Sequence, residues 1–272
     1  PIMASFRDTL KPVSDNSYGI SELMPEEGKD LYSGRGIFFN RLNMDGFGFH
    51  GNGGIAYRTS YAESDTFVFH FDSVMAITKS FVIEKSEFEG VFYPSVQVNK
   101  VRYKWYPQLD VLKLQTIDEP IVLYDGEVAF FGTLLLTPNG VQASGNMTIG
   151  QEQFIGDSIN IGHNALDMKS GTYLITEADQ ASKVHMEGKN ISAKRNMKTG
   201  HTSFSSLNPE QSPVRFPLQK YSSTLSAGNW QSNNKTIQLE ATPNDSIKQF
   251  AATDSSMHGL QFSATKASYS LD

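Results

Sequence analysis

Aromatic rings beside basic side chains are the residues of this chain best suited to bind a ligand. Tyr103, Trp105 and Tyr106 occur next to Arg102 and Lys104. Flat rings stack on sugars, as in carbohydrate-binding modules, and the adjacent cations can hold polar groups of the ligand. The alternative is structural: with a period of two, Tyr103 and Trp105 point into a core while Arg102 and Lys104 face water. The sequence leaves both interpretations open, so the three aromatic residues are candidate ligand-binding residues.

Two pairs of carboxylates have the spacing of a catalytic pair on a strand. Asp125 precedes Glu127, and Glu87 precedes Glu89, by two positions. Such residues share a strand face about 7 Å apart, and a glycosidase needs two carboxylates ~5 to 10 Å apart across a sugar. The same spacing is common on solvated strand faces, and the Gly-x-Ser-x-Gly motif of serine hydrolases is absent. We therefore assign no catalytic residue and expect no enzyme, with a β-solenoid polysaccharide enzyme as the alternative.

No motif for a cofactor or a metal is found. The chain has no cysteine and six histidines, and no two histidines have the i, i+4 spacing of a zinc protease site. Residues 46–51 match the glycine spacing of a dinucleotide-binding motif, but residues 52–57 predict a turn and a strand where that motif needs a helix. A glycine-rich strand or bulge explains these residues instead. We expect neither a cofactor nor a metal.

Charge and hydropathy exclude two classes of partner. The 272 residues include 23 basic and 29 acidic side chains, for a net charge of −6, and no long basic run occurs. Because phosphate affinity needs clustered Lys and Arg, we expect no nucleic-acid partner. A membrane helix needs ~18 consecutive apolar residues, and Asp125 and Glu127 interrupt the longest candidate, residues 121–136. No membrane-spanning segment is expected.

Alternation of apolar and polar residues dominates the segments that carry the candidate aromatic and acidic residues. Residues 66–72 place Phe67, Phe69 and Phe71 on one face, as in a half-buried strand. The same period of two recurs at residues 95–98, 101–105, 111–114, 146–149, 158–161, 183–186, 236–239 and 260–263. Turn residues such as 138–140 separate these runs, and helix-period windows are nearly absent. The pattern predicts an all-β fold, namely an elongated irregular β-solenoid or an open two-sheet stack with few or no helices.

Domain boundaries are weakly marked. Residues 1–30 are rich in Ser, Pro, Asp and Glu and poor in alternation, which predicts an extended entry segment or linker. Residues 31–272 are predicted to form one continuous, repeat-like β-rich domain. The chain begins without Met and ends in strand-like residues, so we expect it to be part of a longer chain.

Five stretches carry a resemblance to a known group of proteins: residues 88–96, 101–107, 123–140, 214–221 and 250–271. The sequences of these stretches resemble those of very large, mostly uncharacterised β-repeat envelope and surface proteins of Bacteroidota. The strand-turn-strand around Leu-Thr-Pro-Asn-Gly at 136–140 is also similar to bridge-like envelope proteins of the AsmA and TamB type. These motifs contain no catalytic residue that could be transferred. The resemblance implies an extracytoplasmic β-rich scaffold, at the cell surface or in the periplasm.

Three functions are consistent with these observations. The first is a non-enzymatic structural or interaction segment of a large bacterial cell-envelope or surface protein. The second is a glycan-binding module in which Trp105 and Tyr106 stack on sugar. The third is a bridge-like lipid-transfer segment, which requires a groove that is apolar along its whole length. We expect other envelope proteins to dock on the C-terminal strand edge, around residues 260–269, with a glycan or a lipid as the ligand.

Overall fold

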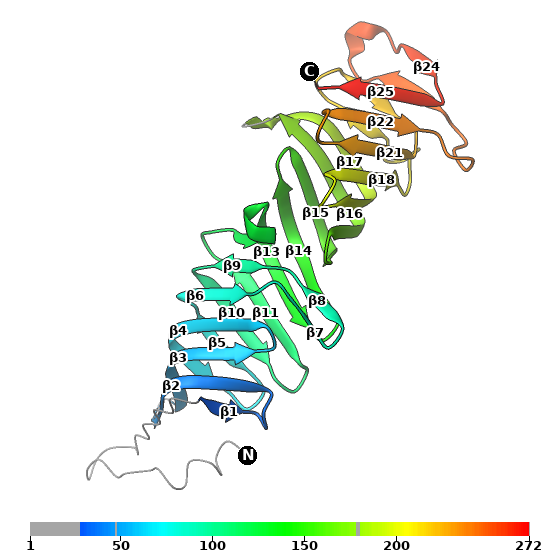
Figure 1. Ribbon diagram of the computed structural model, residues 1–272. Coiled ribbons are helices and arrows are strands. Elements are labelled where there is room, and N and C mark those ends of the chain that lie inside the picture. Colours follow the sequence, from blue (N-terminus) through cyan, green and yellow to red (C-terminus); the bar gives the residue numbers. More distant parts are fainter. Residues whose placement is uncertain (1–27, 47, 178–179, 272) are drawn as a thin grey trace, which may run out of the picture. The chain divides into compact units, whose positions relative to one another are not determined.

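A computed structural model describes residues 28–46, 48–177 and 180–271, which fold almost entirely into β-strands (Figure 1). The all-β prediction is confirmed, and the helical elements of this part are two 3₁₀ turns. Within these ranges no helix has both the length and the apolar character that crossing a membrane requires.

The elements of the first half follow one another closely along the chain. They are β1 (Lys29–Leu31), β2 (Gly36–Asp45), β3 (Gly48–Tyr57), β4 (Ser60–Phe69), β5 (Val74–Ile77), β6 (Ser80–Ile83), β7 (Ser86–Phe88), β8 (Val91–Tyr93), β9 (Val96–Val98), β10 (Val101–Tyr106), β11 (Val111–Thr116), β12 (Ile121–Leu123), η1 (Tyr124–Gly126) and β13 (Val128–Thr137).

The second half continues in the same manner. Its elements are β14 (Gly140–Ile149), β15 (Glu152–Ile161), β16 (Ala165–Glu177), β17 (Gln180–Asn196), β18 (His201–Ser206), β19 (Val214–Phe216), β20 (Tyr221–Ser223), β21 (Ala227–Gln231), β22 (Thr236–Glu240), β23 (Gln249–Ala252), η2 (Ser255–Met257), β24 (Gln261–Ser263) and β25 (Lys266–Ser270).

The chain divides into two compact units. Unit 1 contains residues 1–126 and 131–141, and unit 2 contains residues 127–130 and 142–272. The expected entry segment, residues 1–30, lies outside the described residues except for its last three positions. Two of these, Lys29 and Asp30, already belong to β1.

Unit 1 is built on a row of eight antiparallel strands. In the order of pairing they are β13, β11, β10, β5, β4, β6, β9 and β12. β3 also pairs with β4, β2 with β3, and β1 with β2. The structure contains an eight-stranded closed barrel with extra strands.

β4 pairs with different strands at its two ends. Residues 60–63 of β4 pair with β6, whereas Val68 and Phe69 pair with β5. β4 therefore belongs to the ladders with β5 and β6 as well as to the ladder with β3, and we call this division the fork of β4. The structure is not clearly the expected irregular solenoid or open stack. Alternation predicts that one face of each strand is buried, and a barrel, a stack and a solenoid all satisfy that condition.

Aromatic side chains fill the interior of unit 1. Phe67 is fully buried and Phe69 nearly so, as the period of two predicts. Phe71, expected on the same face, is 91% exposed because β4 ends at Phe69. The ring of Phe38 lies edge-on to Phe67 and Phe69, with centroid distances of 6.1 and 5.6 Å. Such edge-to-face pairs stabilise the core beyond their buried area.

Unit 2 starts as one sheet and then branches. β15, β16 and β17 are long antiparallel neighbours, and β17 pairs with β18 through residues 191–196 and with β19 at Glu187. One branch continues from β18 through β21 and β22 to β25. The other continues from β19 through β20 and β23 to β24. Apolar side chains of the two branches meet between them, as Phe216 and Tyr269 do at 5.9 Å.

Candidate functional site

β10 carries all three aromatic candidates and separates them by face. Tyr103 and Trp105 point inward and are 2% and 0% exposed. The Trp105 ring lies 5.6 Å from Tyr32 and 5.1 Å from Tyr57, centroid to centroid. Burial raises the pKa of the Tyr103 phenol well above its ordinary value of 10.0. Rings buried to this degree offer no face to a ligand in solvent, so the ligand-binding prediction depends on Tyr106.

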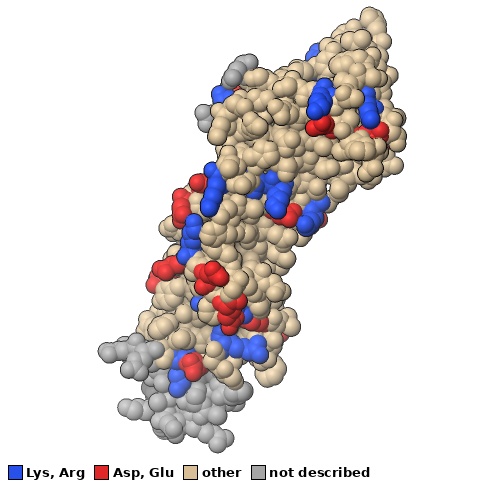
Figure 2. Space-filling model, turned by 45° about the vertical axis from the view of Figure 1, so that its right-hand side comes forward, with Lys and Arg blue, Asp and Glu red and all other residues tan. Residues whose placement is uncertain are grey.

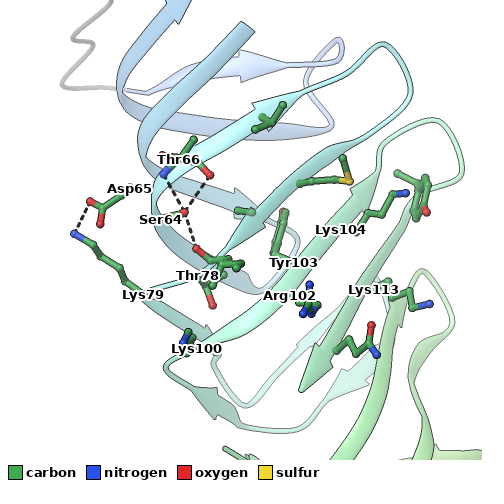
Figure 3. Close-up of a pocket in the computed structure, with 16 residues that line it drawn as sticks. Ser64, Asp65, Thr66, Thr78, Lys79, Lys100, Arg102, Tyr103, Lys104 and Lys113 are labelled. Atoms are coloured by element: carbon green, nitrogen blue, oxygen red, sulfur yellow. Dashed lines mark hydrogen bonds and ion pairs between the residues drawn. The ribbon is translucent and has the colours of Figure 1, made fainter. Parts of the chain in front are cut away.

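Tyr106 belongs to a groove on the outer face of unit 1. This groove, which we call the outer groove, has a volume of about 950 Å³ and crosses four strands (Figure 3). It is lined by Ser64, Asp65, Thr66 and Val68 of β4, by Met75, Ala76 and Ile77 of β5 and the following Thr78 and Lys79, by Lys100 and residues Arg102, Tyr103, Lys104 and Tyr106 of β10, and by Lys113 and Gln115 of β11. The strand pairings therefore bring together residues that are up to 51 positions apart, from Ser64 to Gln115.

Hydroxyl groups hold the bend that shapes the groove. The Ser64 hydroxyl donates to the carbonyl of Ile77 at 2.8 Å and accepts the N–H of Thr66 at 3.1 Å. Thr78 makes a similar link, because its hydroxyl donates to the carbonyl of Asn99 at 2.9 Å and accepts the N–H of Val101 at 3.1 Å. These bonds satisfy backbone groups at the fork of β4, where regular ladder pairing is interrupted. The groove is thus part of the fold and does not need a ligand to form.

Positive charge dominates the outer groove. Five cations line it, against one carboxylate, Asp65. Asp65 pairs with Lys79 at 2.6 Å, and Lys100 reaches Asp118 at 3.5 Å. The face drawn in Figure 2 carries basic and acidic side chains interspersed rather than one basic field. The net charge of the groove lining is therefore positive, whereas the net charge of the whole chain is −6.

Two lysines that line the groove occupy opposed positions on neighbouring strands. Lys104 of β10 lies directly opposite Lys113 of β11 in the strand register. The ammonium group of Lys104 lies 4.9 Å from the centroid of the Tyr106 ring, a cation–π contact. Within the described part of the chain, neither lysine forms an ion pair, and neither does the neighbouring Arg102. Like charges directly opposite each other on a sheet are destabilising, so this arrangement costs stability unless an anion lies between them.

An apolar strip lies beside these cations. Ile77 is 51% exposed and Val68 is 36% exposed. Ile77 is opposite Arg102 in the register, and Met75 is opposite Lys104. The groove can therefore contact an apolar face of a ligand while the cations hold its negative groups. Arg favours two-pronged binding of carboxylate or sulfate, and Lys acts as a point charge.

The sequence pattern identified part of this site. Arg102, Lys104 and Tyr106 follow from the alternation of one strand. Lys113, Met75 and Ile77 were missed, because their contribution depends on which strands pair with β10. The run at 111–114 did show Lys113 pointing away from the core, but no local signal places it opposite Lys104.

The carboxylate pairs are not arranged as expected. Asp125 lies in the 3₁₀ turn η1, and Glu127 follows it outside any strand. Glu87 lies on β7, whereas Glu89 has a φ of 51° and contacts Arg58 at 3.3 Å. Neither pair shares a strand face, so the expectation of a common strand face was wrong for both. Among the described residues, no three His, Cys, Asp or Glu side chains come together to hold a metal ion.

Comparison with protein-family models, with curated proteins and with solved structures finds no match to this chain. Arguments about function therefore rest on the residues and their geometry.

Proposed function

We propose that this chain is a non-enzymatic interaction segment that binds an acidic glycan in the outer groove of unit 1. The observation that carries the proposal is the pair Lys104 and Lys113, directly opposite each other in the strand register and without an ion-pair partner among the described residues, with Lys104 against the Tyr106 ring. A carboxylate or sulfate between the two ammonium groups would turn a repulsive pair into an attractive triad.

A sugar fits the mixture of groups better than other anions do. Sugar rings have one flat face of C–H groups and a polar rim. The Tyr106 ring and the strip formed by Met75 and Ile77 suit the flat face, while Arg102, Lys104 and Lys113 suit acidic substituents on the rim. Nucleic acid would need a longer series of phosphate contacts than these three unpaired cations supply.

A lipid would need a longer apolar surface than the groove provides. The third sequence-based hypothesis, lipid transfer, requires an apolar path for acyl chains. The interior of unit 1 contains aromatic side chains such as Trp105 and Phe67, which are fully buried. An anionic lipid could place its headgroup in the outer groove, and the experiment below distinguishes a lipid headgroup from a glycan.

The setting of this function is a cell envelope or surface, outside the cytoplasm. The support for this part of the proposal is the sequence resemblance to large envelope proteins of Bacteroidota. Acidic polysaccharides are a chemically reasonable ligand in that setting.

An array of immobilised glycans tests the proposal. We expect the wild-type chain to bind oligosaccharides that carry uronic acids or sulfates and to ignore neutral ones. The double variant Lys104→Gln/Lys113→Gln should bind at least about tenfold more weakly, because each lost charge-assisted contact costs roughly 1 kcal/mol or more. Tyr106→Ala should also weaken binding. Trp105→Ala is not informative, because it would remove a core side chain.

A matched control and a second readout complete the test. Lys198→Gln removes an exposed lysine from the turn between β17 and β18 and should bind like wild type. The groove double variant should unfold at the same temperature as wild type or slightly higher, because it relieves repulsion. Absence of binding to any acidic glycan, or undiminished binding by the double variant, would overturn the proposal. Binding to anionic vesicles but not to glycans would assign the groove to lipid headgroups instead.

A further inference from the structure

Two sets of residues with similar chemistry line the outer groove next to each other. Each set contains one residue of β5, one of β10 and one of β11, which are neighbours in the strand register. Triplet A is Met75, Lys104 and Lys113, and triplet B is Ile77, Arg102 and Gln115. Because residues two positions apart share a strand face, the two triplets lie on the same face, about 7 Å apart. The groove therefore repeats an apolar side chain beside a cation once along β10.

Arg102 gives triplet B an unpaired cation of its own. Its side chain is exposed, and within the described part of the chain it forms no ion pair. A planar guanidinium can bind a carboxylate or a sulfate through two hydrogen bonds. Ile77 lies beside Arg102 in the register and offers an apolar contact, since half of its surface is exposed. Triplet B can thus hold an acidic group independently of Lys104 and Lys113.

Ion pairs neutralise the groove beyond triplet B. The ammonium group of Lys100, two positions before Arg102, lies 3.5 Å from the carboxylate of Asp118. That of Lys79 lies 2.6 Å from the carboxylate of Asp65, and Figure 3 shows this pair at the Lys100 end of the groove. The two carboxylates are 72% and 65% exposed, so they repel a further anion. Among the cations that line the groove, those without an ion-pair partner in the described residues all belong to the two triplets.

We propose that the outer groove recognises two acidic groups on neighbouring sugars of one glycan, one at triplet A and one at triplet B. This inference rests on the proposed function and adds the number and spacing of the charges. The sugars that carry the acidic groups place their C–H faces against Met75 and Ile77. A third acidic group beyond triplet B meets the carboxylates of Asp65 and Asp118. The ligand class is an oligosaccharide whose successive sugars carry carboxylates or sulfates.

Oligosaccharides of increasing length test the number of acidic groups that bind. The probes are oligomers of galacturonic acid for carboxylates and sulfated cello-oligosaccharides for sulfates, each with one to four sugars. Titration calorimetry measures their affinity for the full chain. In at least one series, we expect the affinity to rise at least about tenfold from one sugar to two, because a second charge-assisted contact forms. It should rise less than about fivefold from two sugars to four, because the next acidic group is repelled.

Two substitutions examine the two ends of triplet B. Arg102→Gln should weaken binding of the two-sugar probe at least about tenfold and leave binding of the one-sugar probe within about twofold, since triplet A still holds it. Asp118→Asn removes the carboxylate beside Lys100 and should strengthen binding of the four-sugar probe at least about threefold, with the two-sugar probe unchanged. Arg215→Gln, at an exposed arginine of β19 in unit 2, is the matched control and should bind like wild type.

The outcomes separate this inference from the proposed function. If no acidic glycan binds, on the array or in titration, both fail. The two-triplet inference alone fails if Lys104→Gln/Lys113→Gln weakens binding but a second acidic sugar adds no affinity. It also fails if Arg102→Gln weakens the one-sugar and two-sugar probes equally or weakens neither. An acidic glycan bound on the array, with no binding of either probe series, contradicts it as well.

Discussion

At the scale of single residues, a buried carboxylate organises the interior of unit 2. Glu152 of β15 is 1% exposed. It accepts hydrogen bonds from the hydroxyl of Tyr173 at 2.6 Å and from the hydroxyl of Thr202, and it forms an ion pair with Arg195. These groups come from four strands, β15, β16, β17 and β18. The network satisfies charges that would otherwise be costly to bury.

Neutralising the carboxylate of Glu152 should leave the buried guanidinium of Arg195 without a counter-charge. Glu152→Gln keeps an acceptor for Tyr173 and Thr202 but leaves the guanidinium of Arg195 without its counter-charge. We expect a loss of about 3 kcal/mol in the free energy of unfolding, measured by chemical denaturation. The double variant Glu152→Gln/Arg195→Met, which also removes the unpaired positive charge, should recover at least part of that loss. If the double variant is no more stable than the single one, the ion pair is not the source of the effect.

At the scale of elements, β3 contains a bulge that requires glycine. The register of β3 against β4 shifts between Gly51 and Gly53. Gly53 has a φ of 148°, a conformation that side chains rarely adopt, and a Cβ atom there would overlap the carbonyl oxygen of Phe39 on β2. The turn predicted at residues 52–54 is therefore a bulge within a continuous strand. Of the glycine-rich run at residues 46–51, residues 48–51 lie in β3 as the strand interpretation predicts, whereas residue 46 belongs to the turn before β3 and residue 47 lies outside the described residues.

Two glycine-to-alanine substitutions should separate the cost of backbone strain from the cost of steric overlap with β2. Gly53→Ala must accept both an unfavourable φ and a clash with the backbone, so we expect a loss of roughly 3 kcal/mol or more in stability. Gly34→Ala is the matched control in the same unit, because Gly34 has a φ of 83° with open space around its Cβ position. It should lose only about 1 kcal/mol. Equal losses in thermal or chemical denaturation would show that the close approach to β2 is unimportant.

At the scale of the whole molecule, each unit contains a carboxylate whose pKa is lowered on folding. Burial would raise the pKa of Asp245 in unit 2, but hydrogen bonds from Ser226 and Thr242 outweigh it and hold that pKa below its ordinary value of 3.8. In unit 1, burial likewise opposes the hydrogen bonds that Tyr57 and Arg58 donate to Asp110, and the pKa of Asp110 is also lowered.

The sign of these shifts predicts sensitivity to acid. A lowered pKa stabilises the folded state above the ordinary value of 3.8, and this contribution is lost as pH falls through the lower pKa of the folded state. Asp245→Asn should therefore be less stable than wild type at pH 7, and the difference should shrink below about pH 4. Denaturation curves at a series of pH values measure it. A difference that does not change with pH would mean that Asp245 acts through shape and not through its charge.

The sequence by itself determined the local properties of this protein. The period of two at residues 101–105 predicts that Tyr103 and Trp105 face one way and Arg102 and Lys104 the other, and the structure has this arrangement. The turn predicted at residues 138–140 joins β13 to β14. These predictions succeed because the pleat of a strand alone sets the direction of successive side chains, and turn residues act over a few positions.

Only the tertiary structure decided which strands meet. Nothing in the run around Lys104 indicates that Lys113 lies opposite, or that Ile77 lies beside Arg102, because register depends on partners far along the chain. Ser64 illustrates the same point: its hydroxyl holds the fork of β4 through a carbonyl 13 positions away. A solenoid, an open stack and a barrel all bury one face of alternating strands. The choice among them, and with it the outer groove, came from the pairing of strands and not from the pattern within any one of them.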